Sequence, residues 1–380
     1  MNLLFLAEGA LDDPSASGSG IPASIAAHLR ATGLVVSGAD VDLHGWTKAA
    51  AAMATFSPRR RRWAVRYHLG AMPFALRSRN ASRRVRAATG TDAVIQYGAT
   101  FHPRTGKRPL FLYCDSNVPM SLGDPFAWAA SLRREELAAA IDRERRVCEA
   151  AAAIFTASEL ARRAFIEHFR LPPDKVVTVG AGPNFDVAQI HPRREVRAGG
   201  SAPTVLFVGR EFARKGGDVL LRAFRAVRAQ LPQARLVVAG PEKLRSDEPG
   251  VVLLGHLRKR DPESRRRLQQ AYEEADVFCL PTRYEPFGIV FVEAMYHGLP
   301  VVATRVWAVP EIVDDGTTGF TVPRDDENAL AERLLVLLRD PSLARRMGEA
   351  GRVRAQSRFT WAGAAQAMAR VITPTLEARA

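Results

Sequence analysis

The sequence has 380 residues, too many for one ordinary α/β core and enough for two. Hydrophobic residues make up 47% and charged residues 25%, the balance of a folded globular protein. No window offers about 18 uncharged apolar residues, so we expect no transmembrane helix. Residues 1–10 are apolar at first but soon meet Glu8, and we interpret them as a first strand rather than a signal peptide.

Cysteines and histidines are few and scattered. The three cysteines, Cys114, Cys148 and Cys279, form no CxxC pair, and the eight histidines show no metal-ligand spacing. We therefore expect a cytoplasmic protein without structural zinc.

The formal net charge is +14, from 54 Lys and Arg against 40 Asp and Glu. Such an excess favours an anionic partner: nucleic acid, an anionic membrane or a phosphorylated small molecule. Four arginines occupy residues 59–62, before Trp63, and five more lie within residues 77–86. We interpret both clusters as solvated helix faces, with peripheral docking on the inner face of an anionic membrane as the alternative. The sequence has no RNP-like aromatic motif and no zinc finger, so we expect no nucleic-acid partner.

The first half of the chain alternates between strand and helix patterns. Apolar runs typical of buried strands lie at residues 3–7, 93–97, 110–113, 154–157 and 176–179. Apolar residues recur every four positions from Ile21 to Leu29, which predicts a helix, and residues 135–152 have a helical pattern. Ser158 is suited to capping the helix that follows.

Residues 191–203 are polar and rich in breakers, which predicts a domain boundary. The alternation then restarts, with strands predicted at residues 205–208, 236–239, 251–254, 277–280 and 301–303, and helices over about residues 217–231, 262–275 and 287–297. Alternating βαβ units imply parallel sheets. We therefore predict an α/β protein of two Rossmann-like, doubly wound domains, residues 1–190 and 200–360. Ligands should bind at the carboxyl ends of the strands, facing an interdomain cleft.

The strongest chemical signal follows the strand predicted at residues 277–280. Glu285 lies in the turn, and Pro286 is expected at the first helical position, where a missing N–H costs nothing. The free N–H groups of Phe287 and Gly288 would then form an anion site at the helix N-terminus.

Glu293 lies eight residues after Glu285, a rise of about 12 Å along a helix. One carboxylate could hold hydroxyls at the mouth of the helix while the other reaches a more distant part of the same ligand, as a nucleotide-sugar would require. Two surface glutamates on a solvent-facing helix are the alternative, but they leave the apolar Ile289 beside Glu293 unexplained.

A second signal follows the strand predicted at residues 205–208. The strand ends at Gly209, and two cations, Arg210 and Lys215, precede the next helix. Arginine as a planar fork and lysine as a point charge could neutralise a diphosphate leaving group.

These segments resemble glycosyltransferase family 4, the retaining glycosyl transferases group 1 with the GT-B fold. The E-x7-E motif matches as Glu285 and Glu293, and the phosphate-binding pair matches as Arg210 and Lys215. Further matches are Ser158 with Arg162, Gly-Pro-Asn at residues 182–184, and the runs at residues 298–304, 310–313 and 315–320. The resemblance is dense over residues 154–360 and thin over residues 30–150.

The resemblance implies roles for these residues in binding a nucleotide-sugar donor. Glu285 would bind the donor sugar and Glu293 the ribose, while Arg210 and Lys215 stabilise the departing diphosphate. The resemblance also implies that Gly18 and Gly20, in the glycine-rich loop after the first strand, face the donor phosphate and the acceptor. We expect further donor contacts at Phe287, Gly288, Ile289 and Gly209.

The resemblance also implies the chemistry and the division of labour between the domains. No metal or other cofactor is needed, and the donor phosphate takes the acceptor proton on the face from which it departs. The N-terminal domain would bind the acceptor, the C-terminal domain the donor, and the helix within residues 361–380 would pack back on the N-terminal domain.

One departure concerns a histidine that many members of the family carry after a strand of the N-terminal domain. The comparable stretch here is residues 113–117, where Asp115 could accept hydrogen bonds from sugar or acceptor hydroxyls. A turn-capping aspartate is an equally good interpretation. Asp40-Val41-Asp42 matches the DxD of metal-dependent glycosyltransferases only by three letters, and we attribute it to chance.

We therefore predict a retaining, metal-independent glycosyltransferase. Two alternatives stay open: a non-catalytic basic protein that binds an anionic membrane or nucleic acid, and a GT-B sugar-nucleotide epimerase. The donor sugar, its nucleotide base, the acceptor (glycan, lipid-linked or small molecule) and the oligomeric state are not determined by the sequence.

Overall fold

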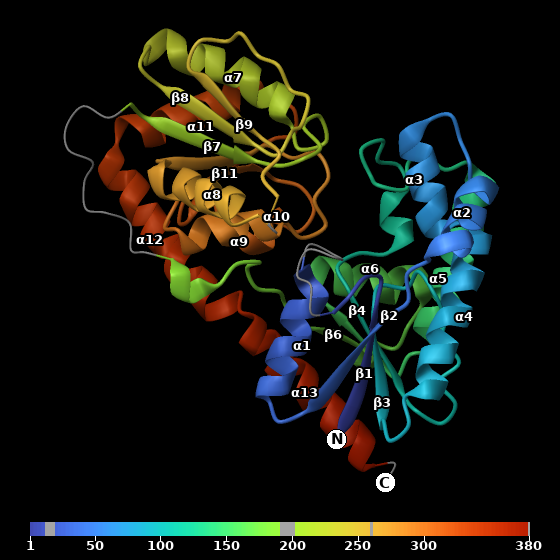
Figure 1. Ribbon diagram of the computed structural model, residues 1–380. Coiled ribbons are helices and arrows are strands. Elements are labelled where there is room, and N and C mark those ends of the chain that lie inside the picture. The colour runs from blue at the N-terminus through green and yellow to red at the C-terminus, as the bar shows by residue number, and fades with distance from the viewer. Residues whose placement is uncertain (12–19, 191–201, 259–260, 379–380) are drawn as a thin grey trace. The chain divides into compact units, whose positions relative to one another are not determined.

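The computed structural model describes residues 1–11, 20–190, 202–258 and 261–378. They divide into two compact units: residues 1–181 with residues 361–380, and residues 182–360 (Figure 1). The second unit thus begins ahead of the boundary predicted at residues 191–203. Most of that predicted linker, residues 191–201, lies outside the described residues.

The first unit is built on a six-stranded parallel sheet in the order β2-β1-β3-β4-β5-β6. Its strands are β1 (Asn2–Ala7), β2 (Val35–Asp40), β3 (Ala93–Tyr97), β4 (Leu110–Cys114), β5 (Ala153–Thr156) and β6 (Val176–Thr178). The central strands are buried almost throughout because helices cover both faces of the sheet, which explains their continuous apolar runs.

Helices α1 (Ile21–Ala31) and α13 (Trp361–Glu377) pack together on one face of this sheet, and α4 (Ala71–Ala87) and α5 (Arg134–Ala150) lie on the other (Figure 1). The predicted cap of α6 (Glu159–Phe169) is confirmed, since Ser158 accepts a hydrogen bond from the N–H of Ala161 at 3.1 Å. The remaining helices are α2 (Gly45–Ala54) and α3 (Arg60–Leu69), with the short 3-10 helices η2 (Val118–Ser121) and η3 (Pro173–Lys175).

The second unit has a six-stranded parallel sheet in the order β12-β11-β10-β7-β8-β9. Its strands are β7 (Thr204–Val208), β8 (Arg235–Ala239), β9 (Val251–Gly255), β10 (Val277–Leu280), β11 (Val301–Thr304) and β12 (Gly319–Val322). Its helices are η4 (Val187–Gln189), α7 (Gly217–Gln230), α8 (Pro262–Glu274), α9 (Ile289–Tyr296), α10 (Val309–Ile312), α11 (Glu327–Arg339) and α12 (Pro341–Arg358). Here α7 packs against α11 and α9 packs against α12.

Both sheets are wound outward in two directions from their first strand. From β1 the chain adds β2 on one side and β3 on the other, and from β7 it adds β8 on one side and β10 on the other. The predicted α/β class with two doubly wound parallel sheets is confirmed. In such sheets ligands bind outside the carboxyl ends of the strands, where the strand order reverses.

Among the described residues, no helix is long and apolar enough to cross a membrane.

Candidate donor site

In the second unit, two loops meet where the strand order reverses. One follows β7 and carries residues 209–216, and the other follows β10 and carries residues 281–288. The strands β7 and β10 are neighbours. Gly216 has a left-handed backbone with φ of +71°, and a Cβ there would lie 1.9 Å from the carbonyl oxygen of Pro281. Glycine at this position therefore permits the close approach of the two loops.

The approach brings together two of the predicted site residues. Lys215 Nζ donates a hydrogen bond to Glu285 Oε2, and the two side chains form an ion pair. Both residues are buried, with 9% of Lys215 and 8% of Glu285 exposed. Burial lowers the pKa of Lys215, whereas the Glu285 carboxylate opposes this shift. The pair thus presents a buried positive and negative group together at the carboxyl edge of the sheet.

Arg283 holds the two loops in place, a role that the sequence analysis missed. Its guanidinium makes hydrogen bonds to both oxygens of Asp218 at 2.7 and 2.8 Å, and to Asp325 at 2.6 Å. These carboxylates, Asp218 first, raise the pKa of Arg283 above its ordinary value, although burial opposes them. Its backbone N–H also donates to the carbonyl oxygen of Arg214 at 2.9 Å. A bidentate arginine of this kind fixes the geometry of a loop more firmly than a single hydrogen bond.

Glu293 lies on α9 and is 3% exposed, so it is not a surface glutamate. Its Oε1 accepts a hydrogen bond from the N–H of Asn184 at 3.3 Å, and its Oε2 accepts one from the hydroxyl of Tyr272 at 3.3 Å. The ring of Tyr272 stacks on His297 at 4.8 Å, and burial lowers the pKa of His297 to about 4. The Gly-Pro-Asn signal at residues 182–184 thus contacts the second predicted carboxylate.

The prediction that the helix begins at Pro286 was wrong. Helix α9 begins at Ile289, after Gly288, which has a left-handed φ of +99°. Glu285 therefore lies in the preceding loop, and the rise estimated along one helix does not separate the two glutamates. Phe287 is 5% exposed, and its ring packs edge-on against that of Phe359.

Arg210 and Gly209, the other two predicted site residues of the loop after β7, differ in their surroundings. Arg210 is exposed, and its guanidinium has no hydrogen-bond or ion-pair partner among the residues that the structure describes. Gly209 lies against Gly240, where a Cβ would be 2.6 Å from the Gly209 carbonyl carbon. Arg210 is thus free to contact an anion, whereas Lys215 is already paired.

The other predicted site residues belong to the first unit. Gly18 lies outside the described residues, and Gly20 is the N-cap of α1 with φ of +88°. Asp115 directly follows β4, is half-buried, and accepts a hydrogen bond from the Ser116 hydroxyl at 3.1 Å. The second unit therefore contains Glu285, Lys215, Glu293, Arg210 and the N-terminus of α9, whereas Gly20 and Asp115 belong to the first unit.

In the part of the chain that the structure describes, no three or more His, Cys, Asp or Glu side chains lie close enough together to hold a metal ion.

Comparison with known proteins agrees with this architecture. Residues 202–340 match the model of the family described as glycosyl transferases group 1. A D-inositol 3-phosphate glycosyltransferase of Corynebacterium efficiens is 33% identical over 58% of this chain and 57% of its own length. A phosphatidyl-myo-inositol mannosyltransferase of Mycobacterium leprae is 39% identical over 44% of this chain and 46% of its own length. The chain thus spans about half the length of these curated relatives.

Solved structures resemble the chain over its whole length. Sucrose-phosphate synthase of Thermosynechococcus elongatus covers 99% of both chains with a TM-score of 0.72 and 22% identity. WaaG, a glycosyltransferase of lipopolysaccharide biosynthesis, covers 97% of this chain and 99% of its own with a TM-score of 0.66 and 16% identity. The Anabaena protein HepE, solved with UDP-glucose, covers 98% and 100% with a TM-score of 0.64 and 18% identity.

The fold is therefore GT-B, as the two doubly wound sheets predicted. Residues 202–340, which match the model of the glycosyl transferases group 1 family, hold both glutamates and both cations of the candidate site. The resemblance identified from the motifs is confirmed.

Proposed function

We propose that this protein is a retaining glycosyltransferase that transfers a sugar from a nucleoside-diphosphate sugar to an acceptor hydroxyl without a metal ion. The observation that carries the proposal is the buried pairing of Lys215 with Glu285 at the strand-order reversal of the second unit, beside the unpaired Arg210. A diphosphate and a sugar are the two chemistries that such a set of cations and carboxylates can hold together.

In the proposed complex each group has one task. Arg210 and Lys215 face the diphosphate with the N-terminus of α9, Glu285 accepts hydrogen bonds from the sugar, and Glu293 accepts them from the ribose. The bond from the anomeric carbon to the diphosphate oxygen breaks, and a bond to the acceptor oxygen forms on the same face. The acceptor proton passes to the departing phosphate, so no protein base is required.

The first test is calorimetric titration of the protein with UDP, GDP and ADP in the presence of a chelator. UDP is the leading choice because HepE was solved with UDP-glucose. We expect one nucleotide to bind, and we expect Arg210→Ala and Glu293→Ala to weaken its binding at least tenfold by removing a charge-assisted contact.

Matched controls keep this test specific to the site. Arg235→Ala removes an exposed arginine at the amino end of β8, the opposite edge of the same sheet, and Glu332→Ala removes an exposed glutamate of α11. Both should leave nucleotide binding unchanged. If none of the three nucleotides binds, the proposal is refuted. If a nucleotide binds, its sugar conjugates are screened, and NMR of the product reports whether the anomeric configuration is retained.

Inositol-containing acceptors are the first to test, because two relatives are named for them. We further propose peripheral contact with an anionic membrane through the first unit. The arginines of residues 59–62 differ in how far they are available for such a contact. Arg61 donates to the carbonyl oxygen of Ala127 at 2.8 Å and Arg62 pairs with Glu136 at 2.9 Å. Arg59 and Arg60 are exposed, as Arg61 is, but their side chains have no hydrogen-bond or ion-pair partner among the residues that the structure describes.

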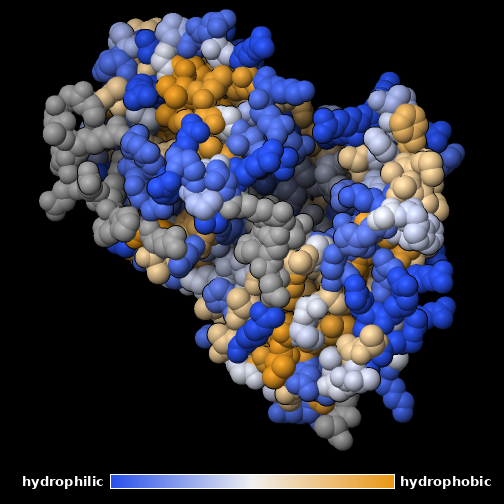
Figure 2. Space-filling model, viewed as in Figure 1, coloured by the Kyte–Doolittle hydropathy of each residue, from blue (hydrophilic) through white to orange (hydrophobic). Residues whose placement is uncertain are grey.

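Exposed apolar side chains lie near these two arginines in the chain. Trp46 is 77% exposed, Met53 73% and Phe56 59%. Figure 2 shows apolar atoms among hydrophilic ones over α2 and α3. Trp63, adjacent to the arginines, is instead half-buried and donates to the carbonyl oxygen of Ala52 at 2.9 Å. Exposed aromatic and basic side chains together suit the interface of an anionic leaflet.

A further inference from the structure

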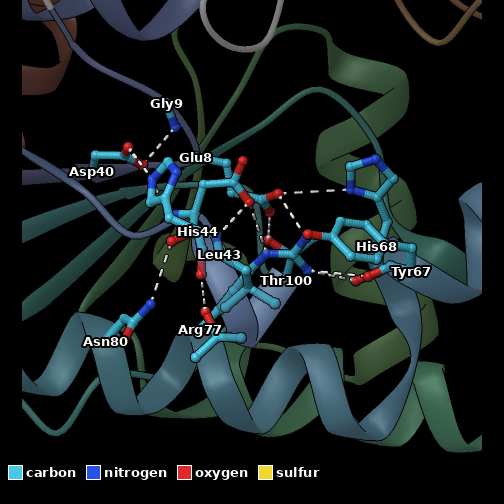
Figure 3. A network of polar contacts seen from close by, with 12 residues as sticks. Glu8, Gly9, Asp40, Leu43, His44, Tyr67, His68, Arg77, Asn80 and Thr100 are labelled. Carbon is cyan, nitrogen blue, oxygen red and sulfur yellow. Dashed lines mark hydrogen bonds and ion pairs between the residues drawn. The ribbon is translucent and has the colours of Figure 1, made fainter. Parts of the chain in front are cut away.

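The first unit has a polar cluster at its own strand-order reversal (Figure 3). Glu8 directly follows β1, and Thr100 lies in the loop after β3. β1 lies between β2 and β3, so Glu8 and Thr100 stand where the winding of the sheet changes direction. Asp42 follows β2 at the same edge. The carboxyl ends of three adjacent parallel strands thus converge on one set of polar groups.

The second unit places its candidate donor residues in the corresponding positions. Arg210 and Lys215 follow β7, its first strand, and Glu285 follows the neighbouring β10. Glu8 and Thr100 occupy the equivalent places after β1 and β3. This correspondence indicates a ligand site in the first unit as well, and the proposed mechanism requires one for the acceptor.

Arg77 of α4 is the buried member of this cluster and contacts several of the others. Its side chain is completely buried, which corrects its interpretation as part of a solvated helix face. Nη1 donates to the carbonyl oxygens of Tyr67 and His68 at 3.3 Å each, at the end of α3. Nη2 lies 3.2 Å from Glu8 Oε2, and the guanidinium lies over the Tyr67 ring at 5.1 Å. Arg77 thereby links the end of α3 to the Glu8 carboxylate.

The buried cation is not fully satisfied by these neighbours. Nε lies 3.8 Å from Asp42 Oδ1, and neither Nε nor Nη2 makes a hydrogen bond among the residues that the structure describes. Buried polar atoms without a hydrogen bond are uncommon in native proteins, and each one calls for an explanation such as a functional role or a bound water or ion. Arg77 is therefore a positioning residue whose electrostatic partners are the carboxylates that face outward.

Glu8 presents the accessible part of the cluster. Its Oε1 accepts a hydrogen bond from the Thr100 hydroxyl at 2.6 Å, and its Oε2 lies 3.6 Å from His68 Nδ1. The Glu8 side chain is 21% exposed and that of His68 is 50% exposed. Burial alone would raise the pKa of Glu8, but His68, Arg77 and Thr100 outweigh it and hold the pKa below its ordinary value. An ionised carboxylate, an imidazole and a hydroxyl therefore reach the surface, and the Arg77 guanidinium beside them is buried (Figure 3).

This combination selects the chemistry of the ligand. Carboxylates accept hydrogen bonds from hydroxyl groups and repel phosphate, and the hidden cation cannot compensate for that repulsion at contact distance. We propose that Glu8, His68 and Thr100 bind vicinal hydroxyl groups of a neutral cyclic polyol or sugar, which is the acceptor of the proposed transferase. The binding site itself stands on the geometry of the first unit, and only its role as the acceptor site rests on the proposed function.

The experiment measures binding of myo-inositol, a neutral cyclic polyol, to the full chain by ligand-observed saturation-transfer NMR. We expect binding to the unmodified protein and at least a tenfold weaker affinity in His68→Ala and in Glu8→Gln. Thr100→Val should weaken binding severalfold. His28→Ala is the matched control, because the His28 ring bonds to Ser24 of its own helix at 2.8 Å, and it should bind as the unmodified protein does.

Glu8→Gln removes the anion beside a buried arginine, so its thermal unfolding is recorded alongside. His68 is more exposed than Glu8 and Thr100 is uncharged, so their variants keep the test valid if Glu8→Gln fails to fold. No binding of myo-inositol, or equal binding by His68→Ala, Thr100→Val and the unmodified protein, overturns the inference. Titration of the same variants with UDP, GDP and ADP separates the two proposals. Binding of one of these nucleotides without binding of myo-inositol refutes only the polyol site, and binding of myo-inositol without any of the three nucleotides refutes only the donor site.

Discussion

At the scale of single residues, Glu144 shows how burial sets the charge of a carboxyl group. It lies on α5, is 7% exposed, and accepts a hydrogen bond from the N–H of Val118 at 2.7 Å. Burial raises its pKa from 4.5 to about 8, and the Val118 hydrogen bond only partly opposes this. The folded protein therefore keeps a proton on Glu144 at neutral pH that the unfolded chain releases.

This raised pKa makes a prediction about stability. Between pH 4.5 and about 8, unfolding releases the Glu144 proton, so the free energy of unfolding falls as pH rises. Glu144→Gln keeps the acceptor oxygen but cannot ionise, so it should lose less stability over this window. The difference should grow toward pH 8 and reach a few kcal/mol, at about 1.4 kcal/mol per pKa unit.

Chemical denaturation at pH 5, 6, 7 and 8 measures this difference. Glu149→Gln, an exposed position on the same helix, is the control. Parallel pH profiles for the unmodified protein and Glu144→Gln would show that Glu144 is ionised in the folded state, contrary to the expectation.

At the scale of elements, the start of α9 depends on a residue that the motif alone did not explain. Gly288 has a left-handed φ of +99°, and a Cβ there would lie 2.6 Å from Phe291 Cδ2 and 2.9 Å from Glu285 Cγ. The glycine is therefore required both by its backbone conformation and by the room that the Glu285 side chain occupies.

Gly288→Ala should consequently harm the donor site as well as stability. We expect a loss of about 1–3 kcal/mol in the free energy of unfolding and a severalfold weaker affinity for the donor nucleotide-sugar, because Glu285 must move. Gly298→Ala is a matched control at the other end of α9: its φ is +68°, but a Cβ there meets nothing within 4 Å.

Denaturation and calorimetry of the two variants separate the effect of backbone strain from the effect of a Cβ that crowds Glu285. Gly298→Ala should lose about 1 kcal/mol and keep its ligand affinity. Equal behaviour of the two variants would mean that crowding against Glu285 has no effect on the site.

Sequence periodicity was sufficient to predict some of the strands but not every helix. The predicted strands at residues 93–97, 110–113 and 277–280 lie within a residue of those observed, because strands buried on both faces are continuous apolar runs. Helix α2 was not predicted, and α3 was expected only as the solvated helix face of the arginines at residues 59–62. Only Ala51 is buried in α2, and only Val65 and Leu69 in α3, so neither helix carries an apolar stripe that repeats over several turns. Tertiary contacts such as Arg62 with Glu136 hold α3 instead.

At the scale of the whole molecule, the proposed membrane contact combines the net charge of +14 with the exposed apolar side chains of the first unit. Sedimentation with vesicles tests their joint effect. We expect the protein to bind vesicles that contain phosphatidylglycerol, to bind phosphatidylcholine vesicles much less, and to be released by salt, because each basic residue near an anionic surface contributes about 1 kcal/mol.

A triple variant identifies the side chains responsible. Replacing Trp46, Met53 and Phe56 by serine should reduce vesicle binding severalfold, since their exposed apolar area no longer enters the interface. Serine at Val336 and Val353, exposed valines of the second unit, is the control and should bind as the unmodified protein does. Equal vesicle binding by all three proteins would refute the contact through α2 and its following loop.

The sequence by itself determined the α/β class, most of the strands, the family resemblance of residues 202–340 and the four charged residues of the candidate donor site. These features are local: a buried strand or a short motif is written in consecutive residues. Only the tertiary structure decided which groups face each other. Lys215 meets Glu285 and Arg77 meets Glu8 across long stretches of chain, and Glu293 meets the N–H of Asn184, because the winding of each sheet brings distant strand ends to one edge. Burial likewise depends on packing and not on the neighbouring residues in the chain. Arg77 belongs to a basic cluster in the sequence, yet it lies buried within a polar network.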